Sequence, residues 1–141
     1  MYLLDTVAIS ALMKPGSAPA AERWLATVEL DDLHVPAPAL AEILRGVARL
    51  PDGTRKTRLR QAYQTHVVPL LDSCPAFDAA AGAIWGELMD AGDAAGRQLP
   101  VIDAQIAAIA LANGLTIVTR NVRDFAPMRV PTVDPWAMGE S

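Results

Sequence analysis

Short apolar segments alternate along this chain with longer segments of helical periodicity, and this alternation is what most restricts the fold. The sequence predicts strands at residues 2–4, 33–35, 67–70, 115–119 and 129–133. It predicts helices at residues 6–13, 21–28, 39–50, 54–65, 75–91 and 102–113, with a loop at 92–100. Buried parallel strands are continuous apolar runs joined by helical crossovers. We therefore expect an α/β fold, a three-layer sandwich in which a mostly parallel sheet of four to five strands carries helices on both faces.

The length and composition of the chain limit the class of protein further. A chain of 141 residues without a repeat or linker predicts a single domain over residues 1–141. A hydrophobic content of 52% excludes a mainly disordered chain, and no apolar run is long enough to predict a membrane span. No basic segment precedes the first apolar run, so no secretory signal is expected. Cys74 is the only cysteine, which fits a reducing, cytoplasmic setting.

Acidic side chains follow or flank the predicted strands. Asp5 comes directly after the first strand, and Asp124 lies in the loop after the strand at 115–119. Glu42 and Asp103 each lie in the first turn of a predicted helix. In open α/β sheets, sites form at the carboxyl ends of the strands. We therefore expect these four carboxylates to converge on one rim of the sheet.

Each of these acids, taken alone, also has an ordinary structural role. Asp5 is a favoured residue for capping the helix that follows it. Glu42 can pair with Arg45 one helical turn later, and Asp103 is favoured near a helix N-terminus by the helix dipole. Asp124 in a loop would normally be solvated. The functional interpretation therefore depends on the set and not on any one member.

The surroundings of Asp103 favour a shared role for the acids. Asp103 lies in the apolar string VIDAQIAAIA, and the nearest basic residue in sequence is Arg97. A buried carboxylate needs a partner, and clustered carboxylates repel one another. A divalent cation meets both needs, and oxygen ligands alone favour Mg²⁺ or Mn²⁺ over zinc. His34 and His66 have no zinc-ligand spacing. The pattern indicates metal-assisted phosphodiester chemistry.

The net charge of the chain argues against nucleic-acid binding by bulk charge alone. The formal charge is −4 at pH 7, from 12 basic and 16 acidic residues. Nucleic-acid-binding domains are usually basic overall. A cation bound at the four acids would remove much of the repulsion toward an anionic substrate.

Several strings in the chain resemble those of PIN-domain ribonucleases of the VapC toxin type, especially the FitB branch. The matching pieces are LLDT and AIS on either side of Val7 at 3–10, Ala41-Glu42 followed by Leu44, Arg45 and Gly46, LPVIDAQIAAIA at 99–110, TRNVRDF at 119–125, and the terminal Pro135-Trp136. Their order, their spacing and the chain length match together over nearly the whole chain. The resemblance implies a PIN-like fold and an endoribonuclease that hydrolyses RNA phosphodiester bonds.

The same resemblance implies roles for individual residues. The catalytic and metal-binding acids would be Asp5, Glu42, Asp103 and Asp124, holding Mg²⁺ or Mn²⁺. Residues that orient water or substrate would be Thr6, Ser10, Thr119 and Asn121. The ordinary alternative for Thr119 and Asn121 is turn formation after a strand.

The resemblance also implies partners. It predicts a VapB-like antitoxin, a homodimer and a larger toxin–antitoxin complex, in which the antitoxin supplies the DNA binding.

One position departs from the family pattern and keeps an alternative open. Val7 stands where family members often have Asn, and its side chain cannot form a hydrogen bond. Thr6 or Ser10 would have to compensate. The alternative is a catalytically weak PIN-like module that binds RNA or protein. A phosphate-receiver domain also gathers acids at strand ends, but it requires a lysine where this chain has Thr119-Arg120.

Overall fold

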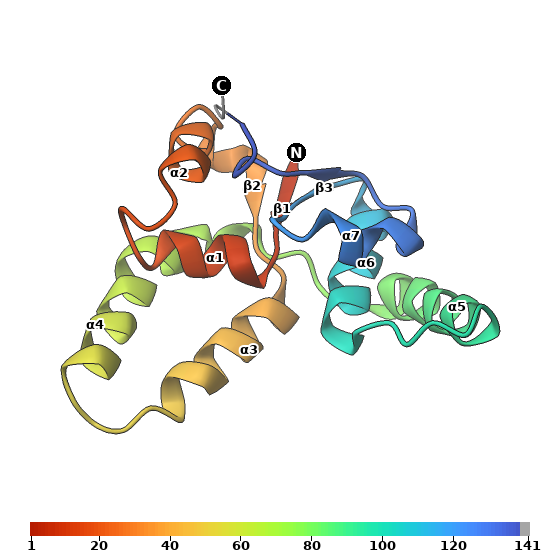
Figure 1. The fold of residues 1–141 in the computed structure, drawn as a ribbon, viewed down its shortest axis with the longest axis horizontal. Helices are drawn as coiled ribbons and strands as arrows, with labels where there is room; N and C mark the ends of the chain where they lie inside the picture. Colours follow the sequence, from red (N-terminus) through yellow and green to blue (C-terminus); the bar gives the residue numbers. More distant parts are fainter. Residues whose placement is uncertain (139–141) are drawn as a thin grey trace.

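A four-stranded parallel sheet forms the centre of the molecule (Figure 1). The computed structural model describes residues 1–138. The strand order is β2-β1-β3-β4. The strands are β1 (Tyr2–Leu4), β2 (Leu33–His34), β3 (Thr116–Val118) and β4 (Thr132–Val133). Every neighbouring pair is parallel, as the sequence predicts.

Helices make up most of the remaining chain. The α-helices are α1 (Thr6–Leu12), α2 (Pro19–Leu25), α3 (Ala37–Ala48), α4 (Thr54–Ala62), α5 (Ala79–Ala94), α6 (Val101–Asn113) and α7 (Val122–Phe125). Shorter helical turns are η1 (Leu30–Asp32), η2 (Tyr63–Val67), η3 (Val68–Ser73) and η4 (Ala126–Met128). No helix within residues 1–138 combines the length and apolar character needed to cross a membrane.

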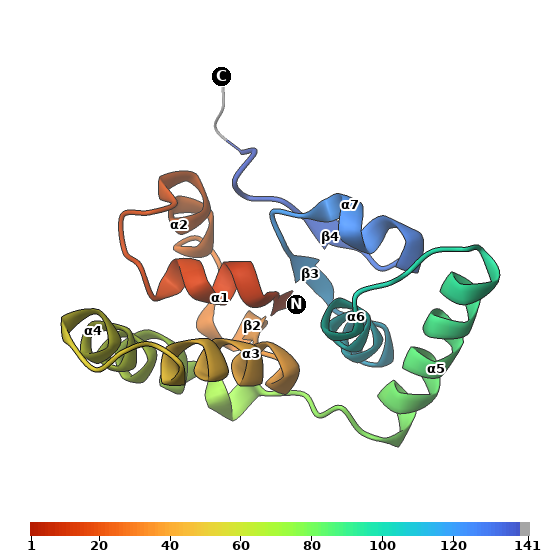
Figure 2. The same ribbon diagram turned by 60° about the horizontal axis from the view of Figure 1, so that its bottom comes forward.

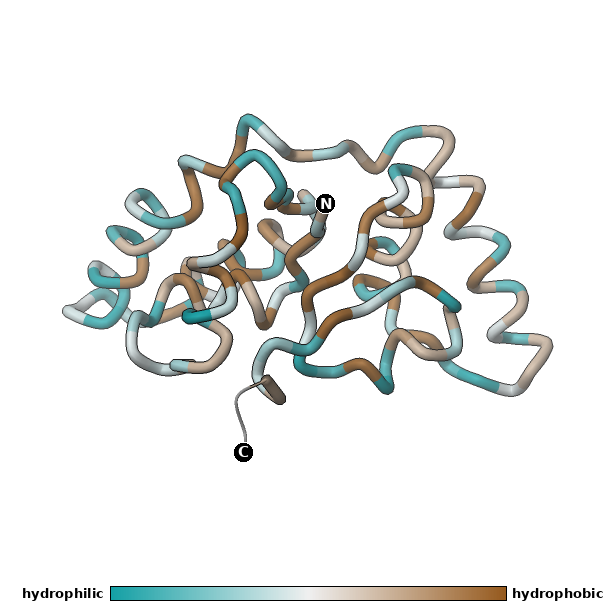
Figure 3. Tube along the Cα trace, turned by 90° about the horizontal axis from the view of Figure 1, so that it is seen from above, coloured by the Kyte–Doolittle hydropathy of each residue, from teal (hydrophilic) through white to brown (hydrophobic). Residues whose placement is uncertain are grey.

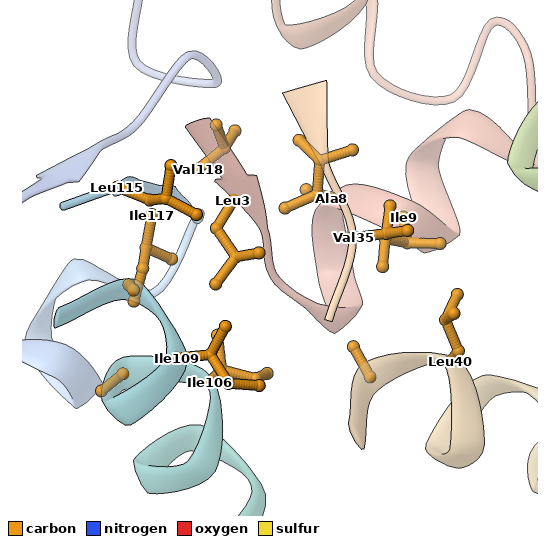
Figure 4. Packing of buried hydrophobic residues seen from close by; sticks show 14 of the residues in the cluster. Leu3, Ala8, Ile9, Val35, Leu40, Ile106, Ile109, Leu115, Ile117 and Val118 are labelled. Carbon is orange, nitrogen blue, oxygen red and sulfur yellow. The ribbon is translucent and has the colours of Figure 1, made fainter. Parts of the chain in front are cut away.

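The two faces of the sheet are covered by different helices. Successive side chains of a strand point to opposite faces. Tyr2 meets Trp24 of α2 edge to face, with ring centroids 4.9 Å apart. Leu3 and Ile117 point the other way, toward α6 (Figure 4). The predicted three-layer arrangement is therefore confirmed.

The hydrophobic core lies around β1, β3 and α6. The Leu3, Ile106, Ile109 and Ile117 side chains are completely buried there. The hydropathy colouring shows the same distribution, with hydrophobic segments along the middle of the molecule (Figure 3). Helix α5 packs outside α6 (Figure 2), so α6 is apolar on nearly all sides, as expected for a helix buried between layers.

The predicted strand at residues 67–70 is wrong. This segment is helical, with one π-helical turn in η2 followed by the 3₁₀ turns of η3. Val67 and Leu70 are buried while Pro69 between them is exposed, which is helical spacing. Pro69 also lacks the N–H that a central strand must donate. The sheet consequently has four strands.

Helix boundaries differ from the prediction where capping residues decide them. Asp78 caps α5, because its Oδ1 accepts a hydrogen bond from the Ala81 N–H at 3.1 Å. The helix therefore starts at Ala79 and continues to Ala94, through part of the predicted loop. The predicted end of α6 is confirmed, since Gly114 adopts the left-handed conformation with φ 64°.

The chain crosses the sheet in two directions, and this fixes where a site can form. From β1 it passes to β2 on one side, and it later returns to β3 on the other side of β1. The order of the strands reverses between β1 and β3. Ligand sites in open α/β sheets lie at the carboxyl ends of the strands at such a point.

We expect Leu3→Ala to lower the free energy of unfolding by about 2–5 kcal/mol, because it leaves a cavity between the sheet and α6. The matched control is Leu44→Ala on α3, whose side chain is 43% exposed. That change should cost within about 0.5 kcal/mol. Urea unfolding followed by circular dichroism measures both. Equal losses in the two variants would contradict the position of the core.

Candidate active site

Asp5 and Thr119 lie side by side where the order of strands reverses. Leu4 and Val118 are paired in the sheet, and the Asp5 N–H donates to the Val118 carbonyl at 3.1 Å. The Thr119 N–H donates to the Val133 carbonyl at 3.0 Å. These bonds extend the parallel ladder by one residue. They fix the backbone from which both side chains leave the sheet.

A pocket of about 360 Å³ opens at this end of the sheet. It is lined by Asp5, Thr6, Val7, Glu42, Pro100, Val101, Ile102, Asp103, Asn121 and Phe125. We call it the acidic pocket. Three of the four predicted acids line it, and they come from the end of β1, from α3 and from the start of α6. The structure therefore brings together side chains that are far apart in the sequence.

Asp5 is only 4% exposed and has two roles. Its Oδ1 accepts a hydrogen bond from the Ala8 N–H at 2.8 Å, so it caps α1. Burial raises the pKa of Asp5, while hydrogen bonds from the Thr119 hydroxyl and from the N–H groups of Ala8 and Val7 oppose that rise. The charge of Asp124 raises the pKa further. The cap thus holds the carboxylate in place at the pocket wall.

Asp103 is the acid that the others perturb most clearly. It lies in the first turn of α6, as predicted, and is partly buried. Burial raises its pKa to about 6, with further contributions from the charges of Asp124, Asp5 and Glu42. All four predicted acids therefore act on one site electrostatically.

Glu42 and Asp124 are both more exposed than the other two acids. Glu42 lies in the second turn of α3 and not the first, because the helix begins at Ala37. Asp124 lies in the short helix α7 and not in a loop, and it does not line the acidic pocket. Within residues 1–138, no three acidic, histidine or cysteine side chains are arranged to bind one metal ion. The four carboxylates therefore lie around one rim of the sheet but not close enough for three of them to contact one ion directly.

The predicted orienting residues occupy different positions around the pocket. Thr119 is completely buried, and its Oγ1 accepts the Asn121 N–H at 2.9 Å. The Thr6 hydroxyl is buried at the pocket edge, and within residues 1–138 it has no hydrogen-bond partner. Ser10 lines a neighbouring groove together with Thr6 and Glu42, and is not part of the acidic pocket.

The chemistry of the pocket fits a hydrated divalent cation. Its acids offer only oxygen ligands, which hard cations prefer. Burial and mutual repulsion raise the pKa values of Asp5 and Asp103, so a positive charge between them would be stabilising. The unpartnered Thr6 hydroxyl could bind a water molecule there.

The apolar wall of the pocket was not identified from the sequence. Phe125, 1% exposed, and Ile102 line the cavity next to the acids. Both directly neighbour a predicted acid in the sequence, which is the signal that could have identified them. An apolar wall lowers the local dielectric constant and so strengthens the electrostatic interactions between the charges in the pocket.

We expect the Asp103 carboxyl of the metal-free protein to titrate near pH 6, and Asp124→Asn to lower that value. Its raised pKa means that the folded state holds a proton that the unfolded chain releases. The free energy of unfolding should therefore fall as the pH rises from about 4 to about 6. The loss should be on the order of 1 kcal/mol, because solvent screens a partly exposed group.

Carboxyl carbon shifts in NMR spectra measure the pKa, and urea unfolding at each pH measures the stability. Asp31→Asn, an exposed change on η1, is the control and should leave the Asp103 titration unchanged. An Asp103 pKa near 4 in protein freed of metal by a chelator would show that burial and the neighbouring acids do not raise it.

Comparison of the sequence and the fold with known proteins identifies the family of this chain. The PIN-domain family model matches residues 2–129. The plasmid stability protein StbB of Pseudomonas syringae pv. tomato is 33% identical, over 96% of this chain and 99% of that protein. Toxin FitB of Neisseria gonorrhoeae is 31% identical over the same shares. The crystal structure of FitAcB from Neisseria gonorrhoeae superposes with a TM-score of 0.87 at 30% identity, covering 98% of this chain and all of that one. The chain belongs to the PIN-domain family.

Proposed function

We propose that the protein is a Mg²⁺- or Mn²⁺-dependent endoribonuclease and the toxin of a VapBC-type toxin–antitoxin system. The observation that carries the proposal is the acidic pocket, where Asp5, Glu42 and Asp103 from three separate elements line one cavity. Burial and the neighbouring acids raise the pKa of Asp103 there. Perturbed carboxylates in a cleft mark functional sites. Support also comes from the relative named VapC ribonuclease Y4jK, of Sinorhizobium fredii, which is 30% identical over 96% of this chain.

We propose that Asp5, Glu42 and Asp103 hold the cation, directly or through bound water, with Asp124 acting as a fourth acid from α7. A bound divalent cation would lower the pKa of water and offset the charge of the phosphate. Thr6 and Asn121 would orient water at the pocket edge.

The protein's own residues supply the remaining steps. Asp5 stays fixed, because its cap on Ala8 and its contact with Thr119 restrict it. Asp103, with its pKa raised to about 6, would accept the proton of the attacking water. The water oxygen would bond to phosphorus as the phosphodiester P–O bond breaks, and the leaving oxygen would take up a proton from solvent while Asp103 later releases the proton that it accepted.

We further propose a VapB-like antitoxin as the protein partner, within a homodimer and a larger toxin–antitoxin complex in the cytoplasm. A FitAB structure solved with IR36 DNA superposes on this chain with a TM-score of 0.86 at 30% identity. A groove of about 270 Å³ between α1, α3 and α4 shares Thr6 and Glu42 with the acidic pocket. An antitoxin segment bound there would lie beside the acids. DNA binding would belong to the antitoxin.

A second candidate function is a catalytically weak PIN-like module that binds RNA or protein. Val7 favours it, because this apolar side chain lines the acidic pocket and is 37% exposed there. An apolar side chain cannot replace the hydrogen bonds that an Asn at this position would make.

We expect Asp5→Asn and Asp103→Asn each to lower metal-dependent RNA cleavage by more than about a hundredfold, because each removes a charge from the proposed ion site. Cleavage of labelled RNA with Mg²⁺, with Mn²⁺ and with a chelator measures the effect. Asp31→Asn is the control with the same charge change and should cut normally.

Two results would separate the candidate functions. Undiminished RNA cleavage by Asp5→Asn or by Asp103→Asn would exclude the acids as the metal site. Wild-type protein that binds RNA and never cuts it with either metal would support the binding module.

We expect Val7→Asn to increase the cleavage rate by about fivefold, since one added hydrogen bond in the pocket is worth about 1 kcal/mol. Val7→Leu is the control, because leucine has nearly the same branched shape as asparagine but adds no polar group. An increase in both variants would show that side-chain size, and not hydrogen bonding, limits the rate.

A further inference from the structure

A second pocket, of about 520 Å³, lies between α5, α7, η4 and the segment that leads into α6. It is lined by Leu88, Ala91, Gly92, Ala95, Arg97, Leu99, Arg123, Ala126, Pro127 and Arg129. Three arginines and no acidic residue line it. We call it the arginine pocket.

The three guanidinium groups have no partners within the described chain. The single ion pair in residues 1–138 joins Lys56 and Asp52 on another part of the surface. No side-chain hydrogen bond of Arg97, Arg123 or Arg129 is formed within those residues. Like charges around one cavity repel one another, so a bound anion would be stabilising.

The wall of the arginine pocket depends on a close approach between two segments. The Arg97 N–H donates to the Gly92 carbonyl at 2.8 Å, which folds the chain back onto the end of α5. A Cβ on Gly92 would lie 2.8 Å from Leu99 Cγ, closer than side chains pack. Gly92 therefore allows the 97–99 segment to lie against α5 and sets the position of Arg97.

Arg129 is held in an unusual backbone conformation. With φ 54° it is the single non-glycine residue of positive φ within residues 1–138. L-residues seldom adopt this conformation, and most chains place glycine or asparagine there. Backbone strain of this kind clusters at ligand sites. Here this conformation ends η4, where the Arg129 N–H donates to the Ala126 carbonyl at 3.3 Å, and it places Arg129 in the wall of the pocket.

The arginine pocket and the acidic pocket are built from the same two segments. Leu99 lines one pocket and the next residue, Pro100, lines the other. Likewise, Phe125 at the end of α7 lines the acidic pocket, and the next residue, Ala126 of η4, lines the arginine pocket. A strand of RNA passing the acids would therefore find three unpaired guanidinium groups next to them.

We infer that the arginine pocket binds a backbone phosphate of the RNA substrate, one that flanks the phosphodiester cut at the acidic pocket. This inference rests on the proposed function. The planar guanidinium fork matches phosphate oxygens in two-point contacts. A chain with a net charge of −4 needs such a local positive site to hold a polyanion. The arginine pocket is thus a positioning site for RNA.

The test compares two double variants of equal net charge. Arg97→Gln with Arg129→Gln removes two guanidinium groups from the pocket. Arg23→Gln with Arg60→Gln removes two from exposed positions on α2 and α4 and is the control. Arg123 is left unchanged because it adjoins Asp124. Binding of a fluorescein-labelled single-stranded RNA of about ten nucleotides is followed by anisotropy, with chelator present to prevent cleavage.

We expect the pocket variant to bind about tenfold more weakly than the control. Its slope of log K against log salt should also be smaller by about 0.7, the value for one lost phosphate contact on a single strand. With metal present, the KM for RNA should rise by a similar factor while kcat changes little. Equal affinity and equal salt slope in the two double variants would overturn the inference.

A single variant guards against an effect of misfolding. Arg129→Gly removes the guanidinium group and suits the positive φ, so its melting temperature should equal or exceed that of the wild type. Its RNA affinity should nevertheless fall. An Arg129→Gly protein that binds RNA like the wild type would count against the site.

Two further results separate this inference from its alternatives. If the wild type binds an oligoglutamate peptide of matched charge more tightly than RNA, and the pocket variant loses that binding, the pocket serves an acidic protein and the inference fails. If wild-type protein never cuts RNA but the pocket variant alone loses RNA affinity, the proposed nuclease function fails and phosphate binding stands.

Discussion

The position of the Asp5 carboxylate at the end of β1 is the constraint on which the rest of the site depends. The parallel ladder fixes its backbone through the Val118 carbonyl, and the cap on Ala8 fixes its side chain. A carboxylate that is only 4% exposed has a raised pKa, and hydrogen bonds only partly offset the cost of burial. Because β3 ends next to β1, Thr119 and the start of α7 are brought to the same place.

Charge separation around one end of the sheet links the acidic pocket to the arginine pocket. The segment before α6 and the segment of α7 and η4 each contribute to both. Arg123 and Asp124 are neighbours of opposite charge in the sequence. Arg123 lines the arginine pocket, whereas the charge of Asp124 acts on Asp103 in the acidic pocket. If the two pockets act as proposed, the scissile phosphate would lie at the cation while a flanking phosphate would meet the guanidinium groups.

Much of the fold could be predicted from the sequence because local signals agreed with the tertiary structure. Strands at Tyr2–Leu4 and Thr116–Val118 are continuous apolar runs, and Asn113-Gly114 ends α6 as expected. The prediction of a strand at 67–70 was wrong because a short apolar run does not distinguish a strand from a buried helical turn. Its Pro69 was the available warning. The predicted start of α5 was four residues too early, because the helix begins after its N-cap Asp78 and not at Pro75.

The convergence of Asp5, Glu42 and Asp103 on one pocket could be predicted from the acids as a set, but the degree to which each carboxyl is perturbed could not. Sequence position indicates that Asp5 and Asp103 face a rim, yet only the packing of α6 against α5 and the sheet determines how far water reaches Asp103. That partial burial matters chemically. A carboxyl with a pKa raised to about 6 is mostly ionised at neutral pH and still basic enough to take a proton from water. In the proposed mechanism, this partial burial would make Asp103 a stronger base than a fully exposed acid.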